Sequence, residues 1–275
     1  MKKNEINVKK SRLSVSVVIP TYKDEKYINK TLKDVKSVLE KMGFDYEIIV
    51  VVDGLIDGTF NIVSELSKRL KKIKTVAYKV NRGKGYALRQ GFSLAKGDLI
   101  GFIDADGQIK AQAIESALKK LTNSDADMVI GSKKHLLSKV VYSTERRILS
   151  KMSQFFIKLL FNVGVSDTQA GLKMFKRKVI GEIGPRLTVD RFAIDIEILS
   201  VAKFMGYKNI EEIPIEVKSV DHGGQKIIQT ISFVDLFKTF SDSLKIFYQL
   251  RIDKFYSLNN KDKWIKLDKP DHSPR

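Results

Sequence analysis

The 275-residue sequence contains no cysteine and only three histidines. Without cysteine the chain can form neither a disulfide nor a thiolate metal site, which fits a reducing compartment. His135 and His222 lack the spacing of metal ligands, so we interpret both as structural or surface residues.

Long apolar runs are also absent. The longest stretch without a charged residue, Leu13–Tyr22, has ten residues, whereas a membrane-spanning helix needs roughly twenty apolar ones. No apolar segment follows the basic residues 1–10 as it would in a signal peptide. We therefore expect no transmembrane segment, which leaves contact with a membrane surface open.

Acidic residues are outnumbered by basic ones: 32 Asp and Glu stand against 50 Lys and Arg, for a net charge of +18. This imbalance favours an anionic partner such as nucleic acid, anionic lipid or a phosphate-bearing substrate. A solvated basic surface without such a partner explains it equally well. Hydrophobic residues make up 43% of the chain, enough for a sizeable core.

Apolar, β-branched runs alternate with helical patterns in the first half of the chain. The runs expected to be buried strands are Leu13–Ile19, Tyr46–Val52, Thr75–Lys79, Leu99–Ile103 and Asp127–Gly131. The helical patterns between them are Glu25–Lys41, Thr59–Lys72, Lys84–Ala95 and Lys110–Leu121. This alternation predicts an α/β fold with a mostly parallel sheet flanked by helices, in which ligands bind at the carboxyl ends of the strands.

The second half of the chain is less regular. Strands are expected at Gly171–Phe175 and Asn209–Val217, and a helix at Phe192–Met205. A last, amphipathic helix is expected over Ser232–Tyr256, with Phe233, Phe237, Phe240, Leu244 and Phe247 on one face. We therefore expect a basic tail over 1–12, an α/β domain over 13–230, an amphipathic helix over 231–258 and a charged, disordered tail over 259–275.

Two carboxylates follow the expected strand Leu99–Ile103. Asp104 and Asp106 lie two residues apart, and such charges are unfavourable beside a buried strand unless a positive charge neutralises them. A divalent cation, Mg²⁺ or Mn²⁺, would do so and would also bridge to substrate phosphates. Gln108 could add a neutral oxygen ligand. The alternative is a solvated acidic turn, which we consider the weaker interpretation after so apolar a strand.

Two further loops carry candidate residues. Asp53 ends the second expected strand, where a carboxylate can accept hydrogen bonds from a base or ribose. We assign Asp57 mainly to capping the helix that follows. Asn81–Gly85 combines glycines, two cations and a helix start, which indicates either a phosphate cradle or an ordinary loop.

Taken in order, these motifs resemble a known family. Val17–Tyr22, Asp53–Thr59, Asn81–Gly85 and Asp104–Asp106 are similar to those of the inverting glycosyltransferases of family 2, which have the Rossmann-like GT-A fold. Asp167–Phe175 and Arg191–Glu197 resemble the dolichyl-phosphate glucosyltransferase branch in particular, within the group that also contains the mannose synthases. The likeness extends over roughly Leu13 to Tyr256. It implies metal-dependent, inverting transfer of a hexose, with glucose favoured, from a nucleotide-sugar to a polyprenyl or dolichyl phosphate.

The resemblance also implies residue roles. The nucleotide-sugar, of the UDP-glucose or GDP-mannose type, would be bound by Pro20, Thr21, Tyr22, Glu25, Asp53, Arg82, Lys84, Asp104, Ala105, Asp106 and Lys226. Asp104, Asp106 and Gln108 would hold Mg²⁺ or Mn²⁺ on its diphosphate. Lys133 and Arg147 would bind the acceptor phosphate. The residues expected to take part in catalysis are Asp104, Asp106, Arg147 and Asp167.

Several positions depart from the family pattern or leave a role open. Val52 and Leu55 replace an aspartate and a serine near Asp53. Lys133 stands where arginine is commoner, and a lysine neutralises phosphate without gripping it bidentately. Asp167 is expected either to orient the acceptor or to cap a turn. Asp195 or Glu197 is expected either to pair with Arg191 or to serve the reaction.

A stripe of apolar residues suggests contact with a membrane. It consists of Ile148, Met152, Phe155, Phe156 and Leu159, flanked by Arg146, Arg147, Lys151 and Lys158. With the 231–258 helix, it predicts peripheral attachment to the cytoplasmic face of a membrane, and core packing is the alternative.

Other functions remain open. They are a polyprenyl-phosphate mannose synthase, a soluble family 2 enzyme that acts on a polysaccharide hydroxyl with a committed base, and a catalytically inactive scaffold. We expect no nucleic-acid partner, because the aromatic residues gather in apolar stripes and no recognition motif is present.

Overall fold

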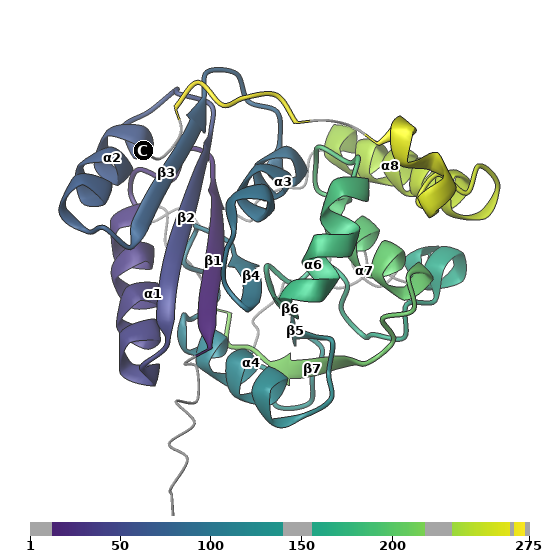
Figure 1. Cartoon of the computed structure of the whole chain (residues 1–275), viewed down its shortest axis with the longest axis horizontal. Coiled ribbons are helices and arrows are strands. Elements are labelled where there is room, and N and C mark those ends of the chain that lie inside the picture. Colours follow the sequence, from purple (N-terminus) through teal and green to yellow (C-terminus); the bar gives the residue numbers. More distant parts are fainter. Residues whose placement is uncertain (1–12, 140–155, 218–232, 265–266, 273–275) are drawn as a thin grey trace, which may run out of the picture.

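The computed structural model describes residues 13–139, 156–217, 233–264 and 267–272 of the chain. Within these ranges a seven-stranded sheet forms the centre of the molecule, with helices on both faces (Figure 1). Every neighbouring pair of strands is parallel except the pairs of β6 with β4 and β5, so the predicted mostly parallel α/β sheet is confirmed. The spatial order β3-β2-β1-β4-β6-β5-β7 joins β1 (Ser14–Thr21), β2 (Asp45–Asp53), β3 (Ile73–Tyr78), β4 (Leu99–Ile103), β5 (Met128–Ser132), β6 (Leu172–Lys176) and β7 (Ile210–Pro214).

Two apolar layers hold the helices on the sheet. One face is covered by α1 (Ile28–Met42), α2 (Thr59–Arg69) and α4 (Gln112–Asn123). The other is covered by α3 (Lys84–Leu94), α6 (Arg177–Ile183), α7 (Ile194–Phe204) and α8 (Phe233–Arg251). Val17 and Ile19 of β1 belong to the first layer, and Val18 belongs to the second. Because both faces are covered, the central strands are continuous apolar runs.

Two helices begin later than their apolar periodicity predicts. α1 begins at Ile28 rather than at Glu25, because the Asp24 N–H donates to Thr59 Oγ1 (3.1 Å) and holds the preceding residues as a loop against α2. α4 begins at Gln112 rather than at Lys110, because the residue before Lys110, Ile109, forms a β-bridge with Val217. Because α1 begins late, residues 22–27 form a loop at the end of β1.

β6 enters the sheet between β4 and β5 and brings the preceding loop to the end of β4. Gly101 of β4 faces Met174 of β6, where an added Cβ would lie 2.2 Å from the Met174 Sδ. At the end of this pairing the Asp104 N–H donates to the Gly171 carbonyl (3.0 Å). The segment 167–171 is thereby placed beside Asp104.

α8 has two apolar faces rather than one. Ile246 and Leu250 are buried, and Phe247 packs edge-on against Phe161 of the helical segment 156–161. The outer face exposes Phe237, Phe240, Leu244 and Tyr248. The sequence predicts Phe247 on the same face as Phe237 and Phe240. That prediction is wrong, because Phe247 packs inward against Phe161. In the described part of the chain, no helix combines the length and the apolar character needed to cross a membrane.

The C-terminal residues return across the molecule to the edge of the sheet (yellow in Figure 1). Ala77 of the edge strand β3 and His272 exchange two backbone hydrogen bonds of 3.0 Å. The Asp271 carboxylate accepts a hydrogen bond from the Lys79 N–H (2.8 Å). The sequence predicts a disordered tail over 259–275, whereas Asp268 is bound by Arg82 and Gln90, and Asp271 and His272 lie beside β3. An edge strand offers unpaired backbone groups to which other segments can bind. Ala77 and His272 are too far apart in the sequence for their contact to be predicted from composition.

Candidate active site

Polar side chains gather at the carboxyl ends of β1, β2 and β4, three neighbouring parallel strands. Thr21 ends β1 and precedes Asp24, Asp53 ends β2, and Asp104 follows β4. Because the strands are parallel, these ends meet at one edge of the sheet, where ligands bind in open α/β folds. The structure therefore brings the first predicted motifs together.

The turn after β4 is held by hydrogen bonds on both sides. The Ala105 carbonyl accepts a hydrogen bond from Thr31 Oγ1 of α1 (2.8 Å), and Asp106 Oδ1 accepts one from the Gln108 N–H (3.0 Å). Gly107 between them has a φ of 67°, in the left-handed region that favours glycine. The turn leaves Asp106 and Gln108 partly exposed at the end of the strand.

Three carboxylates crowd this edge of the sheet. Burial, together with the carboxylates of Asp104 and Asp24, raises the pKa of Asp106 to about 6. Burial also raises the pKa of Asp24, whose carboxylate accepts hydrogen bonds from Thr21 Oγ1 (2.9 Å) and the Tyr22 N–H (3.0 Å). Asp106 and Asp24 thus carry more negative charge than their surroundings favour.

A divalent cation would offset this repulsion. Asp104, Asp106 and Gln108 offer two carboxylates and one amide oxygen, a donor set that fits Mg²⁺ or Mn²⁺ and leaves coordination positions to water and phosphate oxygens. Among the described residues there is no group of three or more His, Cys, Asp or Glu side chains arranged to hold a metal ion. The metal role of the three residues remains a prediction that their chemistry fits.

The raised pKa of Asp106 has a consequence for stability. Because it lies near 6 in the folded state against an ordinary value of about 4, ionised Asp106 destabilises the metal-free fold above pH 6 by at most about 3 kcal/mol, and this effect fades as the pH falls to 4. Asp106→Asn in EDTA should therefore be more stable than the wild type at pH 8 by about 1–3 kcal/mol, and nearly equal at pH 4.5. Urea denaturation at the two pH values measures this difference. The exposed Asp125→Asn serves as control, and an Asp106→Asn variant less stable than the wild type at pH 8 would contradict the expectation.

Lys84, the first residue of α3, points into the protein. Its Nζ lies 2.9 Å from Asp104 Oδ1 and 3.1 Å from Asp195 Oδ2. Burial acts to lower the pKa of Lys84, but the two carboxylates outweigh it and hold the pKa above its ordinary value. Asp195 also pairs with Lys173 of β6, a residue to which the sequence assigned no role.

The expected pairing of Asp195 or Glu197 with Arg191 is therefore corrected. The described ion pairs of Asp195 are those with Lys84 and Lys173. The Glu197 carboxylate accepts hydrogen bonds from the loop before α7. Arg191 lies before the first residue of α7, Ile194, so the helical spacing of four residues that would bring it to Asp195 does not apply.

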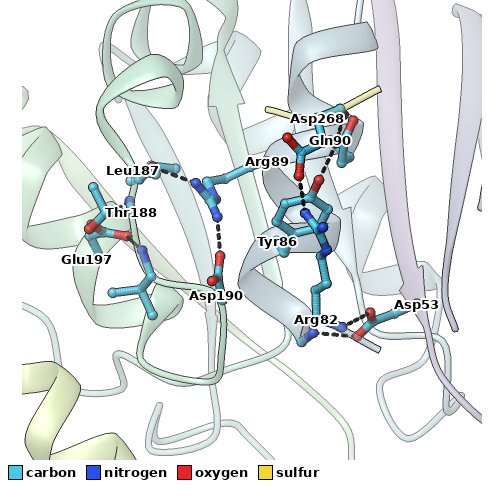
Figure 2. A network of polar contacts seen from close by, with 12 residues as sticks. Asp53, Arg82, Tyr86, Arg89, Gln90, Leu187, Thr188, Asp190, Glu197 and Asp268 are labelled. Atoms are coloured by element: carbon cyan, nitrogen blue, oxygen red, sulfur yellow. Dashed lines mark hydrogen bonds and ion pairs between the residues drawn. The ribbon is translucent and has the colours of Figure 1, made fainter. Parts of the chain in front are cut away.

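Asp53 is buried and shapes the loop between β3 and α3. Its carboxylate accepts hydrogen bonds from Asn81 Nδ2 (2.8 Å), the Arg82 N–H (2.7 Å) and the Gly83 N–H (2.8 Å), as Figure 2 shows for Arg82. Burial raises the pKa of Asp53, and the backbone donors partly offset this effect. Gly83 has a φ of 106°, and an added Cβ would lie 2.4 Å from the Asp190 carbonyl oxygen. Contact of Asp53 with a base or ribose remains a prediction.

The other residues predicted for the nucleotide-sugar differ in what they present. Tyr22 is 43% exposed, whereas Pro20 is buried within β1. The Glu25 carboxylate accepts a hydrogen bond from the Gly58 N–H (2.9 Å) at the start of α2. The Arg82 guanidinium lies over the Tyr86 ring and pairs with Asp268 of the C-terminal segment at 2.5 Å (Figure 2).

Asp57 lies one residue before the N-cap of α2, Gly58, so it is not the capping residue that the sequence predicts. Its Oδ1 accepts a hydrogen bond from the Thr59 N–H (3.1 Å), at the first residue of α2. Its Oδ2 accepts a long hydrogen bond from the Glu25 N–H (3.4 Å). Asp57 therefore joins the start of α2 to the loop that follows β1.

The residues predicted for the acceptor phosphate are only partly described. Lys133 follows β5 and is partly exposed, and its N–H donates to Asp167 Oδ2 (2.9 Å). The buried Asp167 carboxylate also accepts a hydrogen bond from the Gln169 N–H (3.1 Å). These contacts match the turn-holding alternative for Asp167. Arg147 and Lys226, and the stripe residues Ile148, Met152 and Phe155, lie outside the described residues.

Two solved structures show a fold similar to this one. Mannosyl-3-phosphoglycerate synthase from Rubrobacter xylanophilus superposes with a TM-score of 0.64 at 18% identity, over 89% of this chain and 76% of that one. Glucosyl-3-phosphoglycerate synthase from Mycobacterium tuberculosis, solved with Mn²⁺, UDP and glucosyl-3-phosphoglycerate, gives 0.61 at 17% identity, over 86% and 78%. This likeness shows the fold, which is the GT-A fold of nucleotide-sugar glycosyltransferases, as predicted.

Sequence comparison shows the family. Residues 16–184 match Glycosyl transferase family 2. The chain is 34% identical over 243 residues to the dolichyl-phosphate beta-glucosyltransferase of Saccharomyces cerevisiae, and 30% identical over 237 residues to that of Dictyostelium discoideum. Each match covers 82% of this chain and 72% of the relative. The chain therefore belongs to glycosyl transferase family 2 and is a glycosyltransferase, as its motifs predicted.

Proposed function

We propose that this protein transfers glucose, with inversion, from a nucleotide-sugar to dolichyl phosphate or a related polyprenyl phosphate. The support comes from the 34% identity to the yeast dolichyl-phosphate beta-glucosyltransferase over most of both chains. The partly exposed acidic turn after β4 and the partly exposed cation Lys133 after β5 fit two phosphate-bearing substrates.

The donor would bind at the carboxyl ends of β1, β2 and β4. Asp104, Asp106 and Gln108 would hold Mg²⁺ or Mn²⁺, which supplies Lewis-acid stabilisation of the departing nucleoside diphosphate when bound. Tyr22, at 43% exposure, offers a ring for the base. We assign the remaining donor contacts to Pro20, Thr21, Glu25, Asp53, Arg82, Lys84, Ala105 and Lys226.

The acceptor phosphate would lie near Lys133, with Arg147 as a second cation. Leu136 and Leu137, three and four residues beyond Lys133, are among the most exposed apolar side chains of the described chain. A phosphate carried on an apolar polyprenyl tail matches this combination of a cation and exposed leucines. Because that phosphate is anionic near neutral pH, the chain has to position it and offset its charge rather than remove a proton. Asp167, which binds the Lys133 N–H, would hold this loop in place.

The test is a transfer assay with labelled donors. The protein is incubated with UDP-glucose, GDP-mannose and other nucleotide-sugars, together with Mn²⁺ and either dolichyl phosphate in detergent or a free oligosaccharide. Label from UDP-glucose should become lipid-extractable. Transfer of mannose alone would identify a polyprenyl-phosphate mannose synthase instead. Transfer only to a free sugar hydroxyl, with none to the lipid phosphate, would refute the proposed acceptor.

We further propose that the outer face of α8 lies on a membrane surface, at the cytoplasmic face. Phe237, Phe240, Leu244 and Tyr248 form an exposed apolar stripe, and the Phe156 ring stacks on Phe240 with centroids 4.5 Å apart. Basic side chains are exposed on α8 and on the helical segment 156–161, namely Lys158, Lys238, Lys245 and Arg251. Apolar and basic side chains on one helical surface fit the interface of an anionic bilayer.

Replacing Phe237 and Leu244 with serine should release the protein from this surface. Losing both apolar contacts should weaken binding to vesicles with anionic lipid by about tenfold or more, because each buried side chain contributes about 1 kcal/mol or more. Co-sedimentation with vesicles measures the bound fraction. Leu13→Ser, an exposed apolar residue at the start of the sheet, serves as control. Equal co-sedimentation of the double variant and the wild type would rule out this face.

A further inference from the structure

Lys173, the second residue of β6, is a fully buried cation. Its side chain has 0% exposure, and its Nζ donates to the Ala170 carbonyl (2.9 Å) and pairs with Asp195. Burying an ammonium group is unfavourable unless it is paired and hydrogen-bonded. A leucine or methionine would fill the same space in a strand without this penalty, so the presence of lysine calls for another explanation.

The contacts of Lys173 continue to the acidic turn after β4. Asp195 of α7 binds Lys173 with one oxygen and Lys84 with the other (3.1 Å), and Lys84 in turn reaches Asp104 (2.9 Å). Charges of alternating sign therefore run from the interior to the partly exposed Asp104. The Phe102 ring of β4 lies beneath both ammonium groups, with its centroid 5.1 Å from Lys84 Nζ and 5.3 Å from Lys173 Nζ.

Asp104 ends the series of ion pairs Lys173–Asp195–Lys84–Asp104 and is held from two directions. Its Oδ1 is bound by Lys84, while its Oδ2 packs against Gly171, where an added Cβ would lie only 1.9 Å away. The series thus restricts the orientation of the carboxylate that we assign to the cation. Lys84 itself is restrained by Asp195, and Asp195 by Lys173.

We propose that Lys173 is a positioning residue, which orients Asp104 for a divalent cation through Asp195 and Lys84. This proposal rests on the metal role assigned to Asp104 under the proposed function. Removing a group that binds a metal-ligating side chain typically changes metal affinity by about 10- to 100-fold, and Lys84 is such a group for Asp104.

A purely electrostatic effect of Lys173 and a positioning role predict opposite changes in Mn²⁺ affinity for Lys173→Met. With both lysines protonated and both carboxylates ionised, the four groups Lys173, Asp195, Lys84 and Asp104 together carry no net charge. If charge alone mattered, removing one positive charge would make the surroundings more negative and tighten Mn²⁺ binding. If Lys173 positions Asp104, its removal frees Asp195 and Lys84, and Mn²⁺ binding weakens.

The experiment measures Mn²⁺ affinity by titration calorimetry and electron paramagnetic resonance, and thermal stability in parallel, on full-length protein. Lys173→Met and Asp195→Asn should each weaken Mn²⁺ binding by about tenfold or more. The double variant should bind no more weakly than either single variant, because both act through Lys84. It should also recover thermal stability relative to Lys173→Met, because the buried carboxylate oxygen that lost Lys173 is gone. Lys178→Met, which removes a lysine paired with Asp127 on the surface, is the matched control.

The outcomes separate the alternatives. Lys173→Met with unchanged or tighter Mn²⁺ binding would overturn the positioning role. Recovery of both stability and Mn²⁺ affinity in the double variant would reduce the pair to a structural ion pair. If Lys173→Met does not fold, the double variant carries the comparison. It changes no net charge, so charge alone predicts Mn²⁺ binding close to that of the wild type, whereas the positioning role predicts weaker binding. Failure of the wild type to bind Mn²⁺ would overturn the metal assignment itself, and the positioning role with it.

Discussion

Replacing Asp104 with asparagine is expected to lower the initial rate of sugar transfer by about 100- to 1000-fold, as removal of one group that stabilises transition-state charge typically does. Asparagine keeps the size of the side chain against Gly171, so the turn should stay folded. It removes the charge that pairs with Lys84 at 2.9 Å and that we assign to the cation on the diphosphate. Initial rates at saturating donor and acceptor, with Mn²⁺ varied, measure both the loss of rate and the rise in metal requirement.

Asp34→Asn is the matched control for this variant. Asp34 lies on the exposed side of α1, where it pairs with Lys30, and its replacement should leave the rate unchanged. Two results would contradict the assignment of Asp104. One is an Asp104→Asn protein with more than a tenth of the wild-type rate, and the other is a wild-type rate unaffected by chelation of divalent ions.

The largest loss of stability is expected at Glu197 of α7. Its side chain is fully buried, and its carboxylate accepts hydrogen bonds from the N–H and Oγ1 of Thr188 (both 2.9 Å), the Val189 N–H (3.0 Å) and the Tyr256 hydroxyl (2.7 Å). Figure 2 shows Glu197 beside Thr188. Glu197→Ala leaves buried donors without partners and opens a cavity, which should cost about 3–5 kcal/mol. The melting temperature should fall by roughly 10 °C.

The same variant should also lower activity. The loop after Thr188 supports the start of α3, because the Asp190 carbonyl accepts hydrogen bonds from the N–H groups of Gly85 (2.8 Å) and Tyr86 (3.1 Å), next to Lys84. Tyr256→Phe removes only one donor to Glu197 and should cost about 1 kcal/mol. Calorimetric melting of the wild type, Glu197→Ala and Tyr256→Phe measures the order of their stabilities. A Glu197→Ala protein as stable as Tyr256→Phe would show that the carboxylate does not hold the loop.

Much of the fold could be predicted from the sequence. The strands β1 to β5 and the helices α1 to α4 lie within a few residues of their expected positions, because buried parallel strands are continuous apolar runs and surface helices repeat every 3.6 residues. α6 was not predicted, since Arg177–Ile183 is too short for that periodicity to stand out. The contact of His272 with Ala77 could not be predicted, because it depends on an edge strand formed by residues remote in the sequence.

The candidate site divides in the same way. Asp53, Asp104 and Asp106 were predicted because each follows an apolar strand, and parallel strands place their carboxyl ends at one edge. Lys173 and Glu197 were missed as partners. A lysine within the apolar run Leu172–Phe175 was the one local signal of a buried charge. Its partner Asp195 could not be read from the sequence, because the two meet only when β6 and α7 pack together.

By itself the sequence determined most of the segments that become strands and helices, and which acidic residues end the strands. Those properties follow from short-range periodicity and from the chemistry of single side chains. Only the tertiary structure decided that β6 runs antiparallel beside β4, that Asp195 pairs with Lys84 and Lys173 rather than with Arg191, and that the C-terminal residues lie along β3. A charge or an edge strand can be satisfied by many partners, and which partner it meets is set by packing between distant segments.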